Sequence, residues 1–178
     1  MELLDIVDDQ GRPLNITKPR SQIHWDGDWH RTVHVWIKNS RHEALLQKRS
    51  HAKESYPNLW DVSCAGHIAA GQTSVATAIR EVREELGIII HEKDLDYLFM
   101  IKSQSIQHEG AFVDNEINDV FLVKKDLSLS EIHVQKEEIS GIKWILIDNL
   151  KEELKSKPRD FAPHKEEYEK LFAVFNHT

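Results

Sequence analysis

The feature that most constrains the fold is an apolar stripe in the segment "SVATAIREVREEL", residues 74–86. Its members recur at intervals of four, three and four residues: Val75, Ile79, Val82 and Leu86. On an α-helix this spacing places them on one face, which is then buried against a core. Thr73 or Ser74 can cap the start of the helix, and Gly87 suits the left-handed residue after its end. The sequence therefore predicts a core-facing helix over residues 74–86.

The same helix carries a group of carboxylates. Glu81, Glu84 and Glu85 are related by i, i+3 and i+4, so they share a face away from the apolar stripe. Such acidic faces are usually just solvated. Three carboxylates this close also repel one another, and Mg²⁺, which prefers oxygen ligands and bridges carboxylates to phosphates, is the natural cation among them. Arg80, one turn before Glu84, can pair with it and hold it in position.

The loop before the helix favours the metal-site alternative. Gly66 lies fourteen residues before Arg80, and Gly71 gives the loop a second flexible point. Such a loop can fold back and place a backbone carbonyl beside the helix carboxylates.

Segments typical of β-strands lie on both sides of this helix. They are residues 3–8, 31–39, 44–50, 59–64, 95–106, 115–125 and 141–148. Further helices are expected from about residue 148 through 156 and from about residue 163 onward. This order predicts an α/β fold, in which a mixed β-sheet is sandwiched between α-helices. Because no linker divides the chain, we expect a single domain over residues 1–178.

Composition excludes several classes of function. No apolar run is long enough for a membrane helix, and the acidic N-terminus does not resemble a signal peptide. The single cysteine, Cys64, excludes an internal disulfide and suits a reducing compartment, so a soluble cytoplasmic protein is expected. A formal charge of −7 and the lack of a basic stripe argue against nucleic acid as a partner. A phosphorylated small molecule can still bind if cations and a few basic residues make the electrostatic potential at the site positive.

The glycine loop and acidic helix together resemble the Nudix box, G-x5-E-x7-R-E-U-x-E-E-x-G-U, where U is a bulky aliphatic residue. The matching residues are Gly66, Arg80, Glu81, Val82, Glu84, Glu85, Gly87 and Ile88. The resemblance implies a Nudix fold with its box over residues 66–88. One position departs, because Gln72 stands where the box has its first glutamate, and Gln carries no charge. This puts a site for additional cations in doubt, whereas the core metal ligands are retained.

The resemblance also implies a chemistry. Nudix enzymes typically use Mg²⁺ or Mn²⁺ and water to cleave a diphosphate linked to another moiety. Glu81, Glu84 and Glu85 would hold the metal together with the Gly66 carbonyl, with Glu84 essential for turnover, and Arg80 would orient them. The box does not fix the general base; the candidates are Glu116, Glu137 and Glu138.

A second resemblance extends upstream of the box. The stretch "WHRTVHVWI…LLQKRSHAKESYPNLWDVSCAGH" and the later "VDNEINDVF" are similar to isopentenyl-diphosphate isomerase, which shares the Nudix fold. The positions that correspond to its metal ligands are His30, His67, Asp114 and Glu116, and those that correspond to its diphosphate-binding residues are Arg49 and Lys53. His67 adjoins the box glycine and is also a candidate for substrate binding. His24 is one residue out of register with the isomerase's first ligand.

Three departures argue against isomerase chemistry. Ala65 occupies the place of the isomerase's cysteine, and Cys64, one residue earlier on a strand, points to the opposite face. His164 replaces a late tryptophan, and a ring that can be protonated is a poor partner for a carbocation. The third departure is that the isomerase box is degenerate, whereas the segment "REVREEL" here keeps its full set of hydrolase glutamates.

The sequence therefore predicts a hydrolase of the isomerase-like branch, acting on a nucleoside diphosphate or a related linked diphosphate. Hydrolases of this branch have been linked to nucleoside diphosphates and to thiamine diphosphate, and the resemblance does not choose between them. Two alternatives stay open: an isomerase of isopentenyl diphosphate, and a catalytically weak diphosphate-binding module, for which the neutral Gln72 is the support. Trp25 and Trp29 are candidates to stack on a base at the mouth of the site. The oligomeric state is open, with a homodimer as one option.

Overall fold

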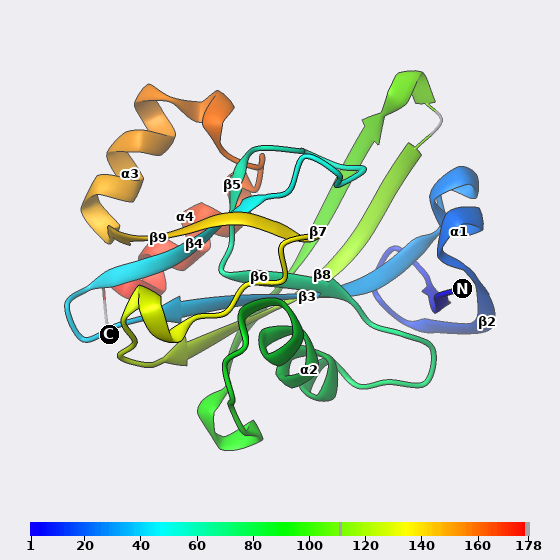
Figure 1. Cartoon of the computed structure of the whole chain (residues 1–178). Helices are drawn as coiled ribbons and strands as arrows, with labels where there is room; N and C mark the ends of the chain where they lie inside the picture. The colour runs from blue at the N-terminus through cyan, green and yellow to red at the C-terminus, as the bar shows by residue number, and fades with distance from the viewer. Residues whose placement is uncertain (111, 177–178) are drawn as a thin grey trace.

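The computed structural model describes residues 1–110 and 112–176, and within them nine strands form one mixed sheet (Figure 1). The strands are β1 (Leu3–Val7), β2 (Pro13–Pro19), β3 (Trp29–Lys38), β4 (Glu43–Arg49), β5 (Trp60–Asp61), β6 (Cys64–His67), β7 (Asp96–Gln107), β8 (Phe112–Lys124) and β9 (Ile139–Leu146). The helices are α1 (Arg20–Asp26), α2 (Ser74–Leu86), α3 (Ile147–Ser156) and α4 (Lys165–Phe175). Short 3-10 turns span Glu92–Asp94, His108–Gly110, Leu129–Glu131 and Pro158–Asp160. No helix in the described ranges has both the length and the apolar composition to cross a membrane.

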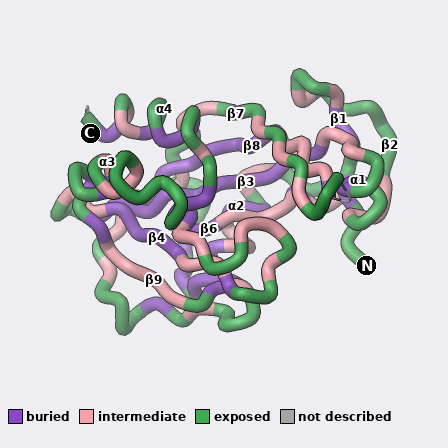
Figure 2. The backbone as a smooth tube through the Cα atoms, turned by 90° about the horizontal axis from the view of Figure 1, so that it is seen from above, coloured by how far each residue is buried: buried purple, intermediate pink, exposed green. Residues whose placement is uncertain are grey.

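The sheet lies between α2 on one face and α3 with α4 on the other (Figure 1). Along β3, Val33, Val35 and Ile37 belong to the core on the α2 side, whereas Trp36 belongs to the core beneath α3 and α4. This period of two is what a strand buried on both faces requires. The tube coloured by burial shows β3, β4 and β8 buried along most of their length (Figure 2). The predicted α/β sandwich is therefore confirmed.

Helix α2 has the bounds that its sequence predicts. Thr73 caps it, because its Oγ1 accepts a hydrogen bond from the backbone N–H of Ala76 at 3.2 Å. Gly87 ends it in the left-handed conformation, with φ of 68°. Val82 and Leu86 are fully buried against the sheet.

Two parts of the sheet differ from the sequence-based expectation. The stretch 59–64, expected as one strand, contains β5 and the start of β6, because β5 pairs with β4 whereas β6 pairs with β3. Strand β2 and helix α1 were not predicted. Strand β2 is largely exposed, so it lacks an apolar alternation, and α1 is only seven residues long.

Strand register brings polar positions together on one face of the sheet. Strand β3 runs parallel to β8, with His30 opposite Glu116, and antiparallel to β6, with Thr32 opposite His67. Residues two apart on a strand share a face, so His30, Thr32 and His34 follow one another along β3 toward Trp36. This polar row is the foundation of the site.

Candidate functional site

A cavity of about 430 Å³ is lined by residues of β3, β6, β8 and α2. One wall comes from α2 and carries Glu81, Glu84 and Glu85; we call it the acidic wall. A second group, which we call the imidazole group, consists of His24, His30, His67, Asp114 and Glu116. The size suits a small-molecule ligand. The acidic residues expected to hold a metal therefore line one cavity, as the helical spacing predicts.

The acidic wall packs directly against β6 at Gly66, where the absence of a side chain leaves room for Glu81. A Cβ added to Gly66 would lie 2.4 Å from Cδ of Glu81, a distance that no real contact allows. Only glycine therefore lets the Glu81 carboxylate lie directly against the backbone of β6. Arg80 donates to Glu84 at 2.9 Å and lies 2.7 Å from a carboxylate oxygen of Glu81, which is the orienting role expected from the sequence.

Burial changes the charge of this wall. It raises the pKa of Glu81 to about 7, against the opposing effect of Arg80. It also raises the pKa of Glu85 to about 7, and Glu85 is only 5% exposed rather than solvated. Cys64 donates from Sγ to Glu85 Oε2 at 3.2 Å. Crowded, buried carboxylates of this kind gain from a bound cation, which removes both the desolvation cost and the mutual repulsion.

The imidazole group contains three rings whose nitrogens converge. Ring centroids of His30 and His67 are 5.2 Å apart, and those of His24 and His30 are 5.0 Å apart. One potential ligand nitrogen from each of the three lies within 4.8 Å of the others. The Nε2 atoms of all three are buried and make no hydrogen bond within the described residues. Buried polar atoms without partners are rare, so this arrangement fits a ligand such as a metal ion.

Backbone carbonyls orient two of these rings. Nδ1 of His24 lies 2.8 Å from the carbonyl oxygen of Arg20, and Nδ1 of His30 lies 3.2 Å from that of Asp28. A carbonyl accepts, so Nδ1 carries the proton and Nε2 keeps a lone pair that no hydrogen bond occupies. Burial lowers the pKa of His30 to about 4 and the pKa of His67 well below its ordinary value. Neutral rings with free lone pairs are what metal coordination needs.

Strand β8 adds two carboxylates to the group. Asp114 Oδ1 lies 3.2 Å from Nε2 of His24 and 3.7 Å from Nε2 of His30. Glu116 Oε1 lies 4.0 Å from Nε2 of both His30 and His67. Burial, together with the charge of Asp114, raises the pKa of Glu116 to about 8. Nitrogen and oxygen donors in this number suit Mn²⁺ or Zn²⁺.

The basic residues expected at the phosphates line the same cavity. Arg49 donates to Asp61 at 2.9 Å and to the carbonyl and hydroxyl oxygens of Ser55 at 2.9 Å each, so it also holds the neighbouring loop in place. Lys53 pairs with Glu138. Both residues face the cavity with part of their hydrogen-bonding capacity already used.

Sequence reasoning missed Arg20, which lines the cavity from helix α1. The same helix places His24 beside His30, although His24 carries little weight in the sequence because it is one residue out of register with the isomerase. A seven-residue helix has no sequence signal of its own. Neither Trp25 nor Trp29 lies among the described residues that line the cavity.

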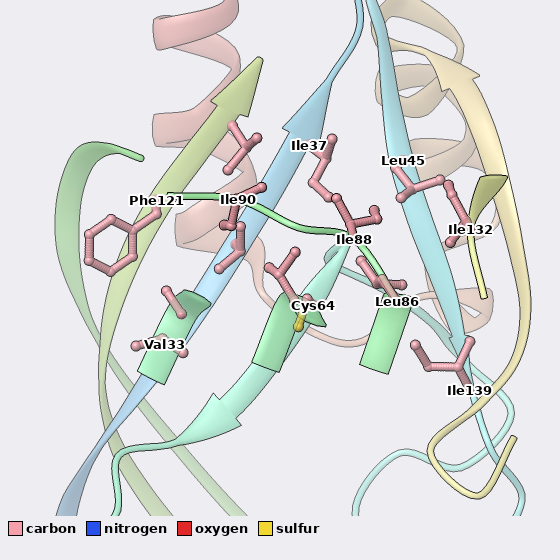
Figure 3. Packing of buried hydrophobic residues seen from close by; sticks show 14 of the residues in the cluster. Val33, Ile37, Leu45, Cys64, Leu86, Ile88, Ile90, Phe121, Ile132 and Ile139 are labelled. Atoms are coloured by element: carbon pink, nitrogen blue, oxygen red, sulfur yellow. The ribbon is translucent and has the colours of Figure 1, made fainter. Parts of the chain in front are cut away.

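Cys64 points to the opposite face of β6 from Ala65, the residue at the position of the isomerase's cysteine. It is fully buried in the core between the sheet and α2, in one hydrophobic cluster with Leu86 and Ile88 (Figure 3). Ala65, the next residue, lines the cavity. The one-residue shift therefore puts a methyl group, not a thiol, in the site, as the strand period predicts.

Comparisons with known proteins agree with this geometry. A NUDIX domain family model matches residues 28–166. "Nudix hydrolase 3" of Arabidopsis thaliana is 38% identical over 178 residues, which cover 97% of this chain but 23% of that protein. An isopentenyl-diphosphate Delta-isomerase of Saccharopolyspora erythraea is 27% identical over 163 residues, covering 92% of this chain and 81% of that protein.

The fold also matches a solved NUDIX domain. The NUDIX domain of NrtR from Shewanella oneidensis, cocrystallised with ADP ribose, aligns with a TM-score of 0.60 at 15% identity, covering 81% of this chain and 86% of that one. The family model spans most of the chain and includes Gly66, Glu81, Glu84 and Glu85. The chain therefore belongs to the NUDIX domain family, the family of the Nudix hydrolases.

Proposed function

We propose that this chain is a metal-dependent hydrolase that cleaves the phosphoanhydride of a small diphosphate by attack of water on phosphorus. The observation that supports it best is the contact between Gly66 and Glu81, which closes the acidic wall against β6. No side chain larger than hydrogen fits there, so the backbone of β6 and the helix carboxylates approach closely enough to share a ligand.

The residues present fit a divalent cation. Glu81, Glu84, Glu85 and the carbonyl of Gly66 would hold Mg²⁺ or Mn²⁺, because all their donors are oxygen. When bound, such an ion supplies a more acidic water and neutralises charge on the phosphates. The imidazole group would hold a second ion with nitrogen preference, such as Mn²⁺ or Zn²⁺.

The protein side chains position the substrate and handle its protons. Arg49 and Lys53 would donate charge-assisted hydrogen bonds to the phosphate oxygens. Glu138, held at the cavity by Lys53, would accept the proton of the attacking water. Glu116, whose Oε1 lies 4.0 Å from Nε2 of both His30 and His67, would serve as an oxygen donor to the ion in the imidazole group.

The test is the variant Glu84→Gln, assayed for phosphate release with Mg²⁺ and with Mn²⁺. The panel contains nucleoside diphosphates, ADP-ribose, nucleotide sugars, dinucleoside polyphosphates and thiamine diphosphate. We expect wild-type turnover on at least one of them and a loss of about 100-fold or more in kcat for the variant, because its carboxylate is replaced at equal size. The exposed Glu92→Gln serves as the matched control and should keep full activity. Full activity of Glu84→Gln with an unchanged melting temperature would refute the assignment.

The imidazole group favours one second candidate, isomerisation of isopentenyl diphosphate. Four of its donors, His30, His67, Asp114 and Glu116, stand at the positions of the metal ligands of the isomerase that the upstream sequence resembles, and an isomerase is among the relatives. Against it stands Cys64, which is buried in the core while Ala65 faces the cavity. Incubation with isopentenyl diphosphate separates the two, since an isomerase forms dimethylallyl diphosphate without releasing phosphate.

We further propose a cytoplasmic location, which the single thiol of Cys64 supports, and a small-molecule diphosphate as the only substrate. ADP-ribose is in the panel because the NUDIX domain of the Shewanella protein was cocrystallised with it. The charge of −7 argues against nucleic acid as substrate.

A further inference from the structure

Two further histidines, His34 and His164, line the cavity outside both metal-binding groups. Their ring centroids are 4.9 Å apart at an interplanar angle of 64°. His34 lies on β3 in the same row as Trp36, toward α4, and His164 directly precedes α4. We call them the histidine pair.

Each member of the histidine pair is bound to its own buried carboxylate. Nδ1 of His34 lies 2.7 Å from Oε2 of Glu167, and Nε2 of His164 lies 3.0 Å from Oδ1 of Asp61. Both carboxylates are almost inaccessible, at 1% and 2% exposed. A buried carboxylate is costly unless it is paired, so these partners lock the two rings in orientation.

Both carboxylates are anchored from behind. Glu167 accepts a second hydrogen bond from Nε1 of Trp36 at 2.8 Å. Asp61 accepts from Arg49 at 2.9 Å. The charge of Asp61 is kept, since His164 and Arg49 outweigh burial and hold its pKa below the ordinary value. This degree of support around a side chain is typical of residues that must be held in one orientation.

The two rings differ in what they offer to the cavity. Both nitrogens of His34 are occupied, Nδ1 by Glu167 and Nε2 by the side-chain amide of Asn118, at 2.9 Å. In His164, only Nε2 is engaged, and Nδ1 makes no hydrogen bond within the part of the chain that the structure describes. An ionised carboxylate can only accept, so Nε2 carries a proton, and the tautomer with its single proton there presents a lone pair at Nδ1.

The histidine pair has the spacing of a metal site, but three of its four ring nitrogens already have hydrogen-bond partners. Nitrogens of the two rings and an oxygen of Glu167 lie within 4.8 Å of one another. A metal would have to displace the bonds of His34 to Glu167 and Asn118, whereas the imidazole group presents unpartnered nitrogens. The geometry therefore favours an organic ligand at His164.

Resting on the proposed hydrolase function, we propose that His164 determines specificity by accepting, at Nδ1, a hydrogen bond from the non-phosphate part of the substrate. The substrate class is then a diphosphate whose other moiety carries hydroxyl or amino groups. Hydrocarbon diphosphates are rejected, because they would bury the Nδ1 lone pair without a donor, and leaving a buried polar atom unpaired is unfavourable.

The test measures binding by calorimetry in the presence of Ca²⁺, so it does not require turnover. The probes are ADP and ADP-ribose, which carry hydroxyl and amino groups, and dimethylallyl diphosphate, which is a hydrocarbon diphosphate. We expect the wild-type protein to bind ADP or ADP-ribose at least tenfold more tightly than dimethylallyl diphosphate.

Two variants separate the two nitrogens of His164. In His164→Gln the amide can still donate to Asp61, but the acceptor at the Nδ1 position is lost, so affinity for the polar probes should fall about tenfold. In His164→Asn an amide oxygen can take the place of Nδ1, and affinity should stay within about threefold. Affinity for dimethylallyl diphosphate should stay unchanged in His164→Asn and rise in His164→Gln, because the acceptor that this probe leaves unpaired is then absent. The exposed His51→Gln is the matched control and should bind like the wild type.

Several outcomes would overturn the role of His164. These are equal wild-type affinity for the polar and hydrocarbon probes, no binding of either polar probe, or an equal loss for all three probes in His164→Gln. Loss of a tightly bound metal from His164→Gln, measured by mass spectrometry, would make it a metal ligand and also overturn it. Selective binding without phosphate release from any diphosphate would sink the hydrolase assignment alone.

Discussion

Gly66 contributes to the site through the side chain that it lacks. Its Cα lies so close to the carboxylate of Glu81 that a methyl group would overlap three atoms of that side chain, at 2.4 to 2.5 Å. The obstacle is not backbone conformation but the occupied space. Because Glu81 is also bound by Arg80, it cannot simply rotate away without breaking that ion pair.

Gly66→Ala should therefore damage activity more than stability. We expect kcat to fall at least about 100-fold because Glu81 is displaced from its metal-binding position, while the free energy of unfolding falls by about 1–3 kcal/mol from overpacking. Phosphate release and urea unfolding measure the two effects separately. Gly141→Ala is the control, because the nearest atom to its added Cβ, on Lys48, is at an ordinary 3.8 Å. Wild-type turnover in Gly66→Ala would show that the close approach has no functional role.

At this scale the sequence predicts the acidic wall better than the imidazole group. Glu81, Glu84 and Glu85 come from one helix, so their spacing along the chain sets their spacing in the site. His24 and His30 come from different elements, and their meeting depends on the path of α1. Pairing across elements leaves no periodic signal in a single sequence.

Helix α4 is attached to the sheet by a buried ion pair as well as by its apolar face. Tyr168, Leu171 and Phe175 pack against the sheet, and Glu167 reaches His34 and Trp36 on β3. Burial disfavours the charged forms of both His34 and Glu167. For each residue, the charges and hydrogen bonds of its neighbours, chiefly of its partner, together outweigh this cost of burial. The pKa of His34 is therefore raised and the pKa of Glu167 lowered.

Glu167→Gln should destabilise the protein most in mildly acidic solution. The contribution of Glu167 is present above its unfolded pKa of 4.5 and is lost below the lowered folded value. The contribution of His34 is present below its unfolded pKa of 6.5 and is lost as pH rises through the raised folded value. We expect a loss of about 3 kcal/mol near pH 5.5 and about 1 kcal/mol near pH 9.

Urea unfolding at the two pH values measures this difference. Glu166→Gln, next along the chain, is the control, because its partner Lys170 is an exposed i, i+4 neighbour and the pair should be worth less than about 1 kcal/mol at either pH. A pH-independent loss in Glu167→Gln would show that the pair is not ionised.

Among the elements, α2 was predicted to the residue because its stripe, cap and terminal glycine all agree. The split of residues 59–64 between β5 and β6 was not predicted, because a change of pairing partner leaves no mark in the amino-acid composition. The same holds for β2, whose exposed residues show no alternation.

For the whole molecule, the imidazole group acts as a junction between distant parts of the chain. It joins α1 through His24, β3 through His30, β6 through His67 and β8 through Asp114. A binding site built from all four elements exists only in the folded state. The free energy of binding a ligand there therefore adds to the free energy of unfolding.

Adding Mn²⁺ should therefore stabilise the wild-type protein against unfolding. At about 100 times the dissociation constant the gain is about 2.7 kcal/mol, measured by thermal or urea unfolding of metal-stripped protein. His30→Gln removes a central donor at similar size, so it should lose the part of this gain that comes from the imidazole group and keep the part that comes from the acidic wall. His51→Gln, which is exposed, should retain it. An identical Mn²⁺ effect in wild type and His30→Gln would exclude the imidazole group as the site.

Strand β6 adjoins both the acidic wall and the imidazole group. Gly66 and His67 are neighbours along it, one against the acidic wall and the other in the imidazole group, and hydrogen bonds to β3 fix the strand in the middle of the molecule. A single rigid peptide unit thus sets the separation between the two groups. The spacing between any two ions that the acidic wall and the imidazole group held would therefore be built into the backbone of β6.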